Sequence, residues 1–186
     1  MVEVGPLKVF NSEVNRVNAP VPLDDPVANP AAPISRQLAV REDHWCFGCG
    51  QDNPIGLKLR FYEDGERVWA PWTPGREHQG YEGIVHGGLT ATVLDEVMGW
   101  AIYIRKLWAV TGTINVRFRK PVQVGVPTRG VAWVERVSGR KVDVRAQLVQ
   151  EYDGTVLADA TAIFIRVPEE QAAAWQGRYF EQSLAQ

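Results

Sequence analysis

The 186-residue sequence has few cysteines, little net charge and no long hydrophobic run. Two cysteines are too few for a disulfide-rich secreted scaffold, so a reducing cytoplasm is the expected location. A net charge of −2 gives no reason to expect nucleic acid as a partner. No stretch approaches the roughly 18 apolar residues of a membrane span, and residues 1–10 lack the basic start and apolar run of an export signal. These absences leave an ordinary globular protein as the expected class.

Prolines are concentrated near the N-terminus, where residues 1–33 hold six of the twelve. This density and the lack of periodicity predict an extended arm with a short strand at 7–10, followed by a short helix at 35–41. The arm either stabilises a dimer or tetramer or is a mobile leader, and both interpretations stay open. We expect three regions: an N-terminal extension over 1–43, one domain over 44–167, and a C-terminal helix or tail over 168–186.

The segment 83–105, GIVHGGLTATVLDEVMGWAIYIR, predicts a long central helix because its apolar residues recur at helical spacing. It carries one acidic pair, Asp95 and Glu96. Small residues one turn from Asp95 let another element approach the carboxylate and exclude water, which makes a carboxylate a stronger base or nucleophile. Alternatively, Asp95 simply bonds a backbone group or an arginine. Glu96 points about 100° away around the helix and is the weaker candidate.

The start of this helix is the second candidate feature. His86, Gly87 and Gly88 fall in its first turn, where backbone N–H groups have no intrahelical partner and the helix dipole is positive. The two glycines would let a ligand oxygen reach these donors, so an oxyanion site is one interpretation. An ordinary tight turn is the other.

The spacing of these two features predicts a dimer. Asp95 follows Gly87 by eight residues, or about 12 Å along a helix. A reacting carbonyl must lie about 3 Å from both the oxyanion donors and the attacking group, so one helix cannot supply both. Two copies of the helix that run antiparallel across a twofold axis could together supply both groups. The spacing therefore predicts an obligate homodimer with two shared sites. A dimer of dimers stays open.

A Cys-x-x-Cys motif, Cys46 to Cys49, follows His44. This spacing is half of a zinc site, but a closed structural site needs four ligands and the sequence has no second pair. A zinc ion shared across subunits and a redox pair are the alternatives. The preferred interpretation is a tight, partly buried turn without a metal.

Alternating hydrophobicity and turn residues predict an antiparallel sheet. A first hairpin is expected around Asp64-Gly65, with strands near 57–62 and 67–72. After the helix, strands are expected near 110–119, 128–137, 141–152 and 155–167, and a terminal helix at 169–182. In the strand at 110–119, Val110, Gly112 and Ile114 are predicted on one face and Thr111 and Thr113 on the other. Together these elements predict an α+β architecture.

Several motifs occur in the order found in one known family. Residues 78–88 (HQGYEGIVHGG) are followed by Asp95, nine residues after the histidine, and are preceded by CFGCG at 46–50 and NPIGL at 53–57. With residues 110–121, they resemble the PaaI-like group of hotdog-fold acyl-CoA thioesterases over roughly 44–167. The resemblance implies a hotdog fold, in which an antiparallel sheet wraps a long central helix, and hydrolysis of acyl-CoA to free acid and CoA.

The resemblance also implies roles for particular residues. Asp95 would be the catalytic carboxylate, and the Gly87 N–H would polarise the thioester carbonyl, with His86 orienting the carbonyl or holding the loop. Gln79 is the nearest candidate for the amide side chain that many of these enzymes place a few residues before the histidine. Thr111 matches a position near the reacting centre, or is simply a strand-end threonine. No metal or organic cofactor is required.

Three further points concern the substrate. Trp100 and Tyr103 could line an acyl pocket or belong to the core. The basic cluster Arg117, Arg119 and Lys120 could meet coenzyme A phosphates or form a solvated strand face. Two rival functions remain: an enoyl-CoA hydratase or dehydratase on the same fold, and a non-catalytic acyl-CoA-binding module.

Overall fold

The computed structural model describes residues 35–39 and 43–179. The arm expected over 1–33, with its strand at 7–10, therefore lies outside the described residues. Among the helices that the structure describes, none has the combination of length and apolar character that crossing a bilayer requires.

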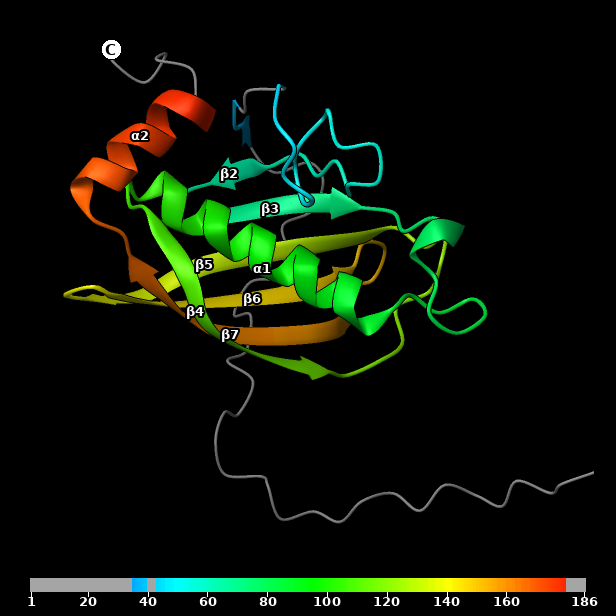
Figure 1. The fold of residues 1–186 in the computed structure, drawn as a ribbon. Helices are drawn as coiled ribbons and strands as arrows, with labels where there is room; N and C mark the ends of the chain where they lie inside the picture. The colour runs from blue at the N-terminus through cyan, green and yellow to red at the C-terminus, as the bar shows by residue number, and fades with distance from the viewer. Residues whose placement is uncertain (1–34, 40–42, 180–186) are drawn as a thin grey trace, which may run out of the picture. The chain divides into compact units, whose positions relative to one another are not determined.

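Within the described residues, seven strands form one antiparallel sheet in the order β1-β2-β3-β5-β6-β7-β4 (Figure 1). Short connections such as Ser138 to Lys141 join neighbouring strands directly, whereas β4 crosses to the far edge of the sheet. The strands are β1 (Arg36–Gln37), β2 (Tyr62–Asp64), β3 (Arg67–Trp72), β4 (Ala109–Phe118), β5 (Thr128–Ser138), β6 (Lys141–Gln150) and β7 (Val156–Arg166).

Helix α1 (Gly87–Ile104) lies across one face of this sheet (Figure 1). Its apolar stripe, which includes Val93, Leu94 and Val97, is fully buried against the strands. The sheet allows this close approach because β5 presents Gly130, where a Cβ would lie 3.3 Å from methyl groups of Val93 and Val97. The hotdog arrangement of a long helix held in a curved antiparallel sheet is confirmed.

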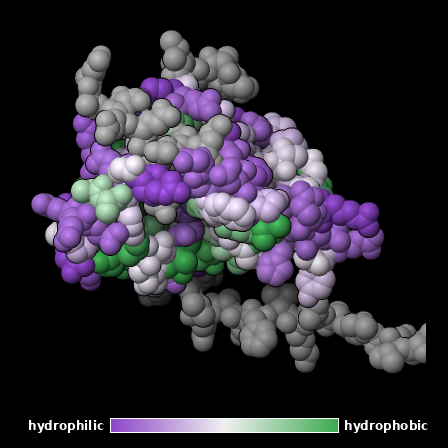
Figure 2. All heavy atoms as spheres, turned by 45° about the horizontal axis from the view of Figure 1, so that its top comes forward, coloured by the Kyte–Doolittle hydropathy of each residue, from purple (hydrophilic) through white to green (hydrophobic). Residues whose placement is uncertain are grey.

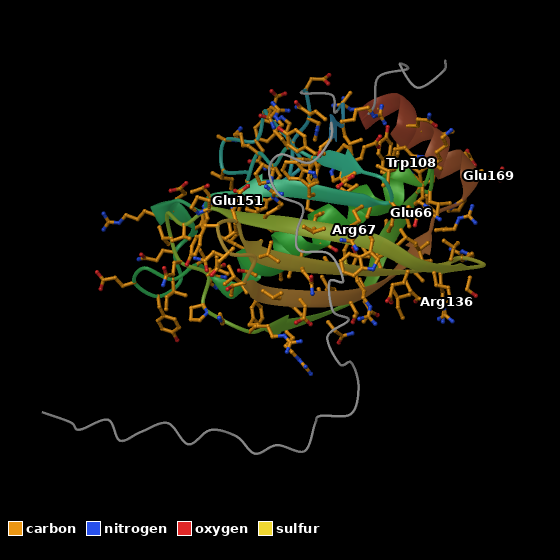
Figure 3. The ribbon with its side chains drawn as sticks, turned by 180° about the vertical axis from the view of Figure 1, so that it is seen from behind. Glu66, Arg67, Trp108, Arg136, Glu151 and Glu169 are labelled. Carbon is orange, nitrogen blue, oxygen red and sulfur yellow. The ribbon has the colours of Figure 1, made fainter. Side chains whose placement is uncertain are left out.

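The opposite face of the sheet carries charged side chains, as Figure 3 shows from behind. Arg136 pairs with Asp143 at 2.7 Å, and Arg129 pairs with Glu151 at 2.5 Å. Because side chains alternate along a strand, charge on this face accompanies the apolar contact with α1 on the other. Hydrophobic side chains also reach the surface in patches among hydrophilic ones (Figure 2). Large examples are Trp45, Ile55, Tyr81, Val110 and Phe118.

Three local predictions were wrong. Arg36 and Gln37 form strand β1 rather than a helix, because they pair with Glu63 and Tyr62. Residues 57–61 have the predicted buried alternation but are not a sheet strand. The N–H groups of Leu57 and Leu59 instead donate to the carbonyls of Phe47 and Gly48 in the preceding loop, so this stretch pairs with a loop outside the sheet.

The third correction concerns β4. A β-bulge separates Thr111 from Thr113, so that Gly112 is an extra residue in the pairing with β7. The bulge shifts by one residue the alternation of side chains between the two faces of β4. Thr111 therefore lies on the face that points toward α1, together with Ile114, which packs against the core. A side chain at Gly112 would meet Ile163 and Ile165 at 3.1–3.2 Å, so glycine suits the bulge.

Helix α2 (Glu169–Tyr179) follows β7, and the end predicted at residue 182 lies outside the described residues. Trp175 on α2 makes an edge contact with Trp108, with ring centroids 6.5 Å apart. Arg178 forms an ion pair with Asp43 at 3.6 Å. These contacts hold α2 next to the C-terminal end of α1, near the start of β4.

Candidate active site

The start of α1 is capped by His86. Its backbone is extended (φ −61°, ψ 129°), and its Nδ1 accepts a hydrogen bond from the Gly88 N–H at 3.0 Å. The Gly88 donor is therefore used within the chain. Gly87 is the first helical residue, and an N–H at this position has no intrahelical acceptor. Of the two predicted glycine donors, Gly87 is the one that a ligand can use without breaking the cap.

Gln79 lies in the loop that leads to this cap. Its Oε1 accepts from the Gly83 N–H at 2.9 Å, and its backbone forms a bridge with Val85. The His86 N–H donates to the His78 carbonyl at 2.9 Å, which closes the loop against the helix start. In this structure Gln79 holds the loop in place, and its side chain is exposed.

Asp95 and Thr111 are brought together by α1 and β4. The Thr111 hydroxyl donates to Asp95 Oδ1 at 2.7 Å. The β-bulge at Gly112 makes this possible, because without it Thr111 would point away from α1 while Ile114 packed inward. Asp95 is partly buried and Thr111 exposed, so the pair is accessible from solvent.

A cavity of about 680 Å³ opens beside this pair. Its volume is within the range of small-molecule sites, roughly 300–1,000 Å³. Asp95 and Thr111 form part of its polar lining, together with Glu96 and the two cysteines. Much of its remaining wall is aromatic, made by Trp100, Tyr103, Trp108 and Trp175. For Trp100 and Tyr103, the sequence left two roles open, a pocket lining and a core position. Both residues line the cavity, and their rings also pack edge to face with centroids 5.3 Å apart.

Gly87 opens into a different cavity, of about 340 Å³. Its lining includes Phe118, Arg119 and Lys120 from the end of β4 and the loop that follows. Arg119 is also paired with Asp159. In one chain, therefore, the predicted carboxylate and the predicted oxyanion donor face separate spaces.

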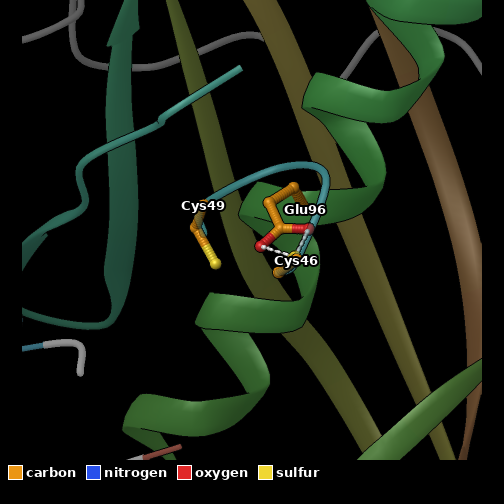
Figure 4. Close-up of side chains that lie close together, drawn as sticks. All are labelled: Cys46, Cys49 and Glu96. Carbon is orange, nitrogen blue, oxygen red and sulfur yellow. Dashed lines mark hydrogen bonds between the residues drawn. The ribbon is translucent and has the colours of Figure 1, made fainter. Parts of the chain in front are cut away.

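The polar lining of the larger cavity also contains a cluster of three ionisable side chains, which we call the thiol–carboxylate cluster: Cys46, Cys49 and Glu96 (Figure 4). A hydrogen bond from the Cys49 thiol and backbone N–H groups of the loop lower the pKa of Cys46 to about 5. Burial and the charge of Cys46 raise the pKa of Glu96 to about 7. The hydrogen bond to Cys46 and burial raise the pKa of Cys49.

Sequence reasoning missed this cluster. The Cys-x-x-Cys motif and Glu96 were weighed separately, because 46 residues lie between Cys49 and Glu96 in the sequence. The sequence does contain a signal for each part of the cluster: the Cys-x-x-Cys spacing for the cysteines, and an acidic residue within an apolar helix for Glu96. Their proximity depends on how the loop folds over α1, which no local pattern encodes.

Comparison with known proteins gives consistent results. The thioesterase superfamily matches residues 82–157. Acyl-coenzyme A thioesterase THEM4 of Xenopus laevis is 31% identical over 109 residues, covering 58% of this chain and 49% of that protein. THEM4 of Mus musculus is 30% identical over 112 residues, covering 60% and 48%. The chain thus spans about half the length of the curated relatives it matches.

Among solved structures, the Escherichia coli PaaI protein of the phenylacetic acid degradation operon superposes with a TM-score of 0.56 at 17% identity, covering 60% of this chain and 81% of that chain. This likeness shows a shared fold. Together with the superfamily match, it confirms the resemblance inferred from the motifs. Residues 82–157 match the thioesterase superfamily, and the described residues have the hotdog fold.

Proposed function

We propose that the protein hydrolyses acyl-CoA thioesters to a free acid and CoA, at a site shared by two copies of the chain. The observation that carries this proposal is the Asp95–Thr111 pair at the mouth of an aromatic cavity, with the Gly87 donor in a separate space. The relatives named acyl-coenzyme A thioesterases support the substrate class.

The larger cavity suits the acyl group. Its aromatic wall would bury an apolar or aromatic acyl chain, and its polar edge at Asp95 would lie next to the thioester carbonyl. The acyl group would therefore enter between α1 and β4, with its reactive end held near the Asp95–Thr111 pair.

The second half of the site would come from the partner subunit. The Gly87 N–H at the positive end of the α1 dipole is suited to the oxyanion that forms when the carbonyl is attacked. Lys120 and Arg119 beside it provide positive charge for the phosphates of coenzyme A.

A suitable dimer surface exists along β4. This strand lies at one edge of the sheet, and its inner and outer faces expose Phe118 and Val110, which are 55% and 46% accessible in the single chain. Exposed hydrophobic residues on an edge strand are normally covered. A second copy packed here would bring its own α1 alongside, which the shared site requires.

The reaction follows from these groups. Asp95 takes a proton from water, the hydroxide attacks the carbonyl carbon, and the partner's Gly87 N–H stabilises the tetrahedral oxyanion. Collapse of this intermediate breaks the C–S bond, and the CoA thiolate leaves and takes up a proton. A direct attack by Asp95, giving a mixed anhydride that water then hydrolyses, uses the same residues. In both routes the Thr111 hydroxyl holds Oδ1 and leaves Oδ2 to react.

A complementation experiment tests both the residues and the shared site. Asp95→Asn removes the carboxylate, and Gly87→Pro removes the N–H while keeping a residue that suits the first helical position. Each variant alone should release thiol from acyl-CoA at a small fraction of the parent rate. When the two chains are co-expressed with different tags and purified as a mixed dimer, one of the two sites is intact, and activity should return to about half of the parent value.

Different outcomes identify different errors. Hydrolysis by Asp95→Asn within a few-fold of the parent would remove Asp95 from the mechanism. Verified mixed dimers with no recovered activity would mean that the site is not shared. Hydration of an enoyl-CoA without thiol release would favour the hydratase, and a bound thioester that stays intact for days would favour the binding module.

A further inference from the structure

The thiol–carboxylate cluster joins two parts of the chain that are distant in sequence. Cys46 and Cys49 come from the loop before β2, and Glu96 comes from the middle of α1. Cys46 Sγ lies 3.6 and 3.7 Å from the two Glu96 carboxylate oxygens, and one ligand atom from each residue lies within 4.8 Å of the others (Figure 4). Both cysteines are free thiols.

The separation of Cys46 from Glu96 matches one edge of a tetrahedral zinc site, and Cys49 lies close enough to join it. With Zn–S near 2.3 Å and Zn–O near 2.0–2.2 Å, sulfur and oxygen ligands of one ion lie about 3.5 Å apart. The observed Cys46–Glu96 distance is 3.6 Å. A disulfide would instead require the two sulfur atoms to approach to about 2.05 Å. Two thiols and a carboxylate form a ligand set that suits Zn²⁺ better than hard cations such as Mg²⁺ or Ca²⁺.

The surroundings hold the carboxylate in this place. The Trp100 indole N–H donates to Glu96 Oε1 at 3.4 Å, in the way that neighbouring groups orient metal ligands. Gly48, between the two cysteines, lies directly against Glu96, and a Cβ there would overlap the carboxylate. His44 contributes to the loop instead, since its Nδ1 accepts from the Cys46 N–H at 3.3 Å.

We propose that Cys46, Cys49 and Glu96 bind a Zn²⁺ ion within a single chain. The sequence had suggested that a second cysteine pair would be needed, but the helix supplies the third ligand. All three residues line the larger cavity, so the fourth position of the ion would face that cavity and take a water molecule. Three protein ligands and one open position are typical of zinc sites that are accessible to small molecules.

The ion would also cross-link the loop to α1. This proposal does not depend on the hydrolysis proposed above, because the roles of Asp95 and Gly87 need no metal. The two can fail separately.

The test is a metal analysis of the full chain. Protein is incubated with Zn²⁺, dialysed, and analysed by mass spectrometry for metal content, with the expected result of one zinc ion per chain. Replacement by Co²⁺ should give the intense thiolate-to-cobalt absorption and the visible bands of a tetrahedral site. Cys49→Ser and Glu96→Gln should each lower zinc affinity by tenfold or more. Asp95→Asn, which changes the adjacent acid in the same cavity, should keep the zinc and lose only hydrolysis.

A second measurement does not depend on whether the variants fold. Removing zinc from the parent protein with a chelator should lower its Tm, and adding Zn²⁺ back should restore it, because a ligand that binds the folded state stabilises it. A parent protein that retains no zinc after dialysis would overturn the proposal. So would a cobalt derivative without thiolate absorption, or equal zinc content in the parent and Cys49→Ser.

Discussion

The Thr111 hydroxyl donates a 2.7 Å hydrogen bond to Asp95 Oδ1, and a β-bulge at Gly112 turns Thr111 toward the helix so that this bond can form. Bulges are over-represented next to active sites, where they re-aim a side chain. Here the bulge gives one face of β4 both a core residue, Ile114, and a polar partner for the carboxylate.

Thr111→Val should reduce hydrolysis without unfolding the protein. A hydrogen bond to a charged group contributes about 1.5–3 kcal/mol, and the exposure of this pair favours the lower end, so kcat should fall about tenfold. The rate of thiol release from a saturating acyl-CoA measures the effect.

The matched control is Thr113→Val, which makes the same change two residues later on β4, beyond the bulge, where the side chain is exposed. Its kcat should stay within twofold of the parent. Equal losses in the two variants would mean that the strand, and not the bond to Asp95, sets the rate.

Gly87 can be tested through its N–H alone. Gly87→Pro removes the donor, while His86 already has the extended backbone that the residue before proline prefers. Gly87→Ala keeps the donor, and its Cβ would meet only the Phe118 ring at 3.4 Å, an ordinary contact. The proline variant should lose about a hundredfold or more in kcat, as when one oxyanion donor is removed.

The alanine variant should keep most of the activity. If alanine and proline reduce kcat equally, the glycine is needed for space and the oxyanion role of its N–H is wrong. Circular dichroism of both variants checks that α1 remains folded.

The helix and the later hairpins were predictable because their signals are local. Apolar residues at helical spacing predicted α1, and turn residues such as Ser138-Gly139 separated strands that pair with their neighbours in the sequence. The stretch 57–61 shows where this reasoning stops. Its alternation correctly predicted which side chains are buried, but its partner is a loop whose position depends on tertiary packing.

The candidate site was predictable in its parts and not in its arrangement. Asp95, Gly87 and His86 were identified from their residue types and positions in the helix, and the resemblance added Thr111. The orientation of Thr111 required the bulge, which is a property of the pairing between β4 and β7. The thiol–carboxylate cluster required a loop to fold onto the helix. From the two cysteines alone, a turn was the preferred interpretation, with a zinc ion shared across subunits and a redox pair as alternatives.

The aromatic wall predicts how acyl preference can be changed. Trp108 lines the larger cavity and contacts both Tyr103 and Trp175. Trp108→Ala should lengthen the cavity, so kcat/KM should shift several-fold toward longer acyl chains, since each methylene that fits contributes about 1–3 kcal/mol. A panel of acyl-CoAs from short to long measures the shift.

Trp133→Ala provides the comparison, because Trp133 lies on β5 with Arg67 over its ring and does not line the cavity. Its relative preference among acyl chains should match that of the parent. A similar shift in both variants would place the acyl group elsewhere.

Gly130 sets how closely the sheet approaches α1, and two substitutions there should have different effects on stability. A Cβ at this position would lie 3.3 Å from Val93 and Val97, which is tight but close to an ordinary contact. Gly130→Ala reduces the conformational entropy of the unfolded chain, which stabilises the folded state by about 0.4–1 kcal/mol. This gain offsets the crowding, so the free energy of unfolding should change little. Compared with alanine, valine at position 130 places two further carbon atoms in a fully packed contact. Gly130→Val should therefore destabilise the protein by about 1–3 kcal/mol. Urea denaturation of both variants measures the difference, and equal stability of the two would show that α1 can move away from the sheet at no cost.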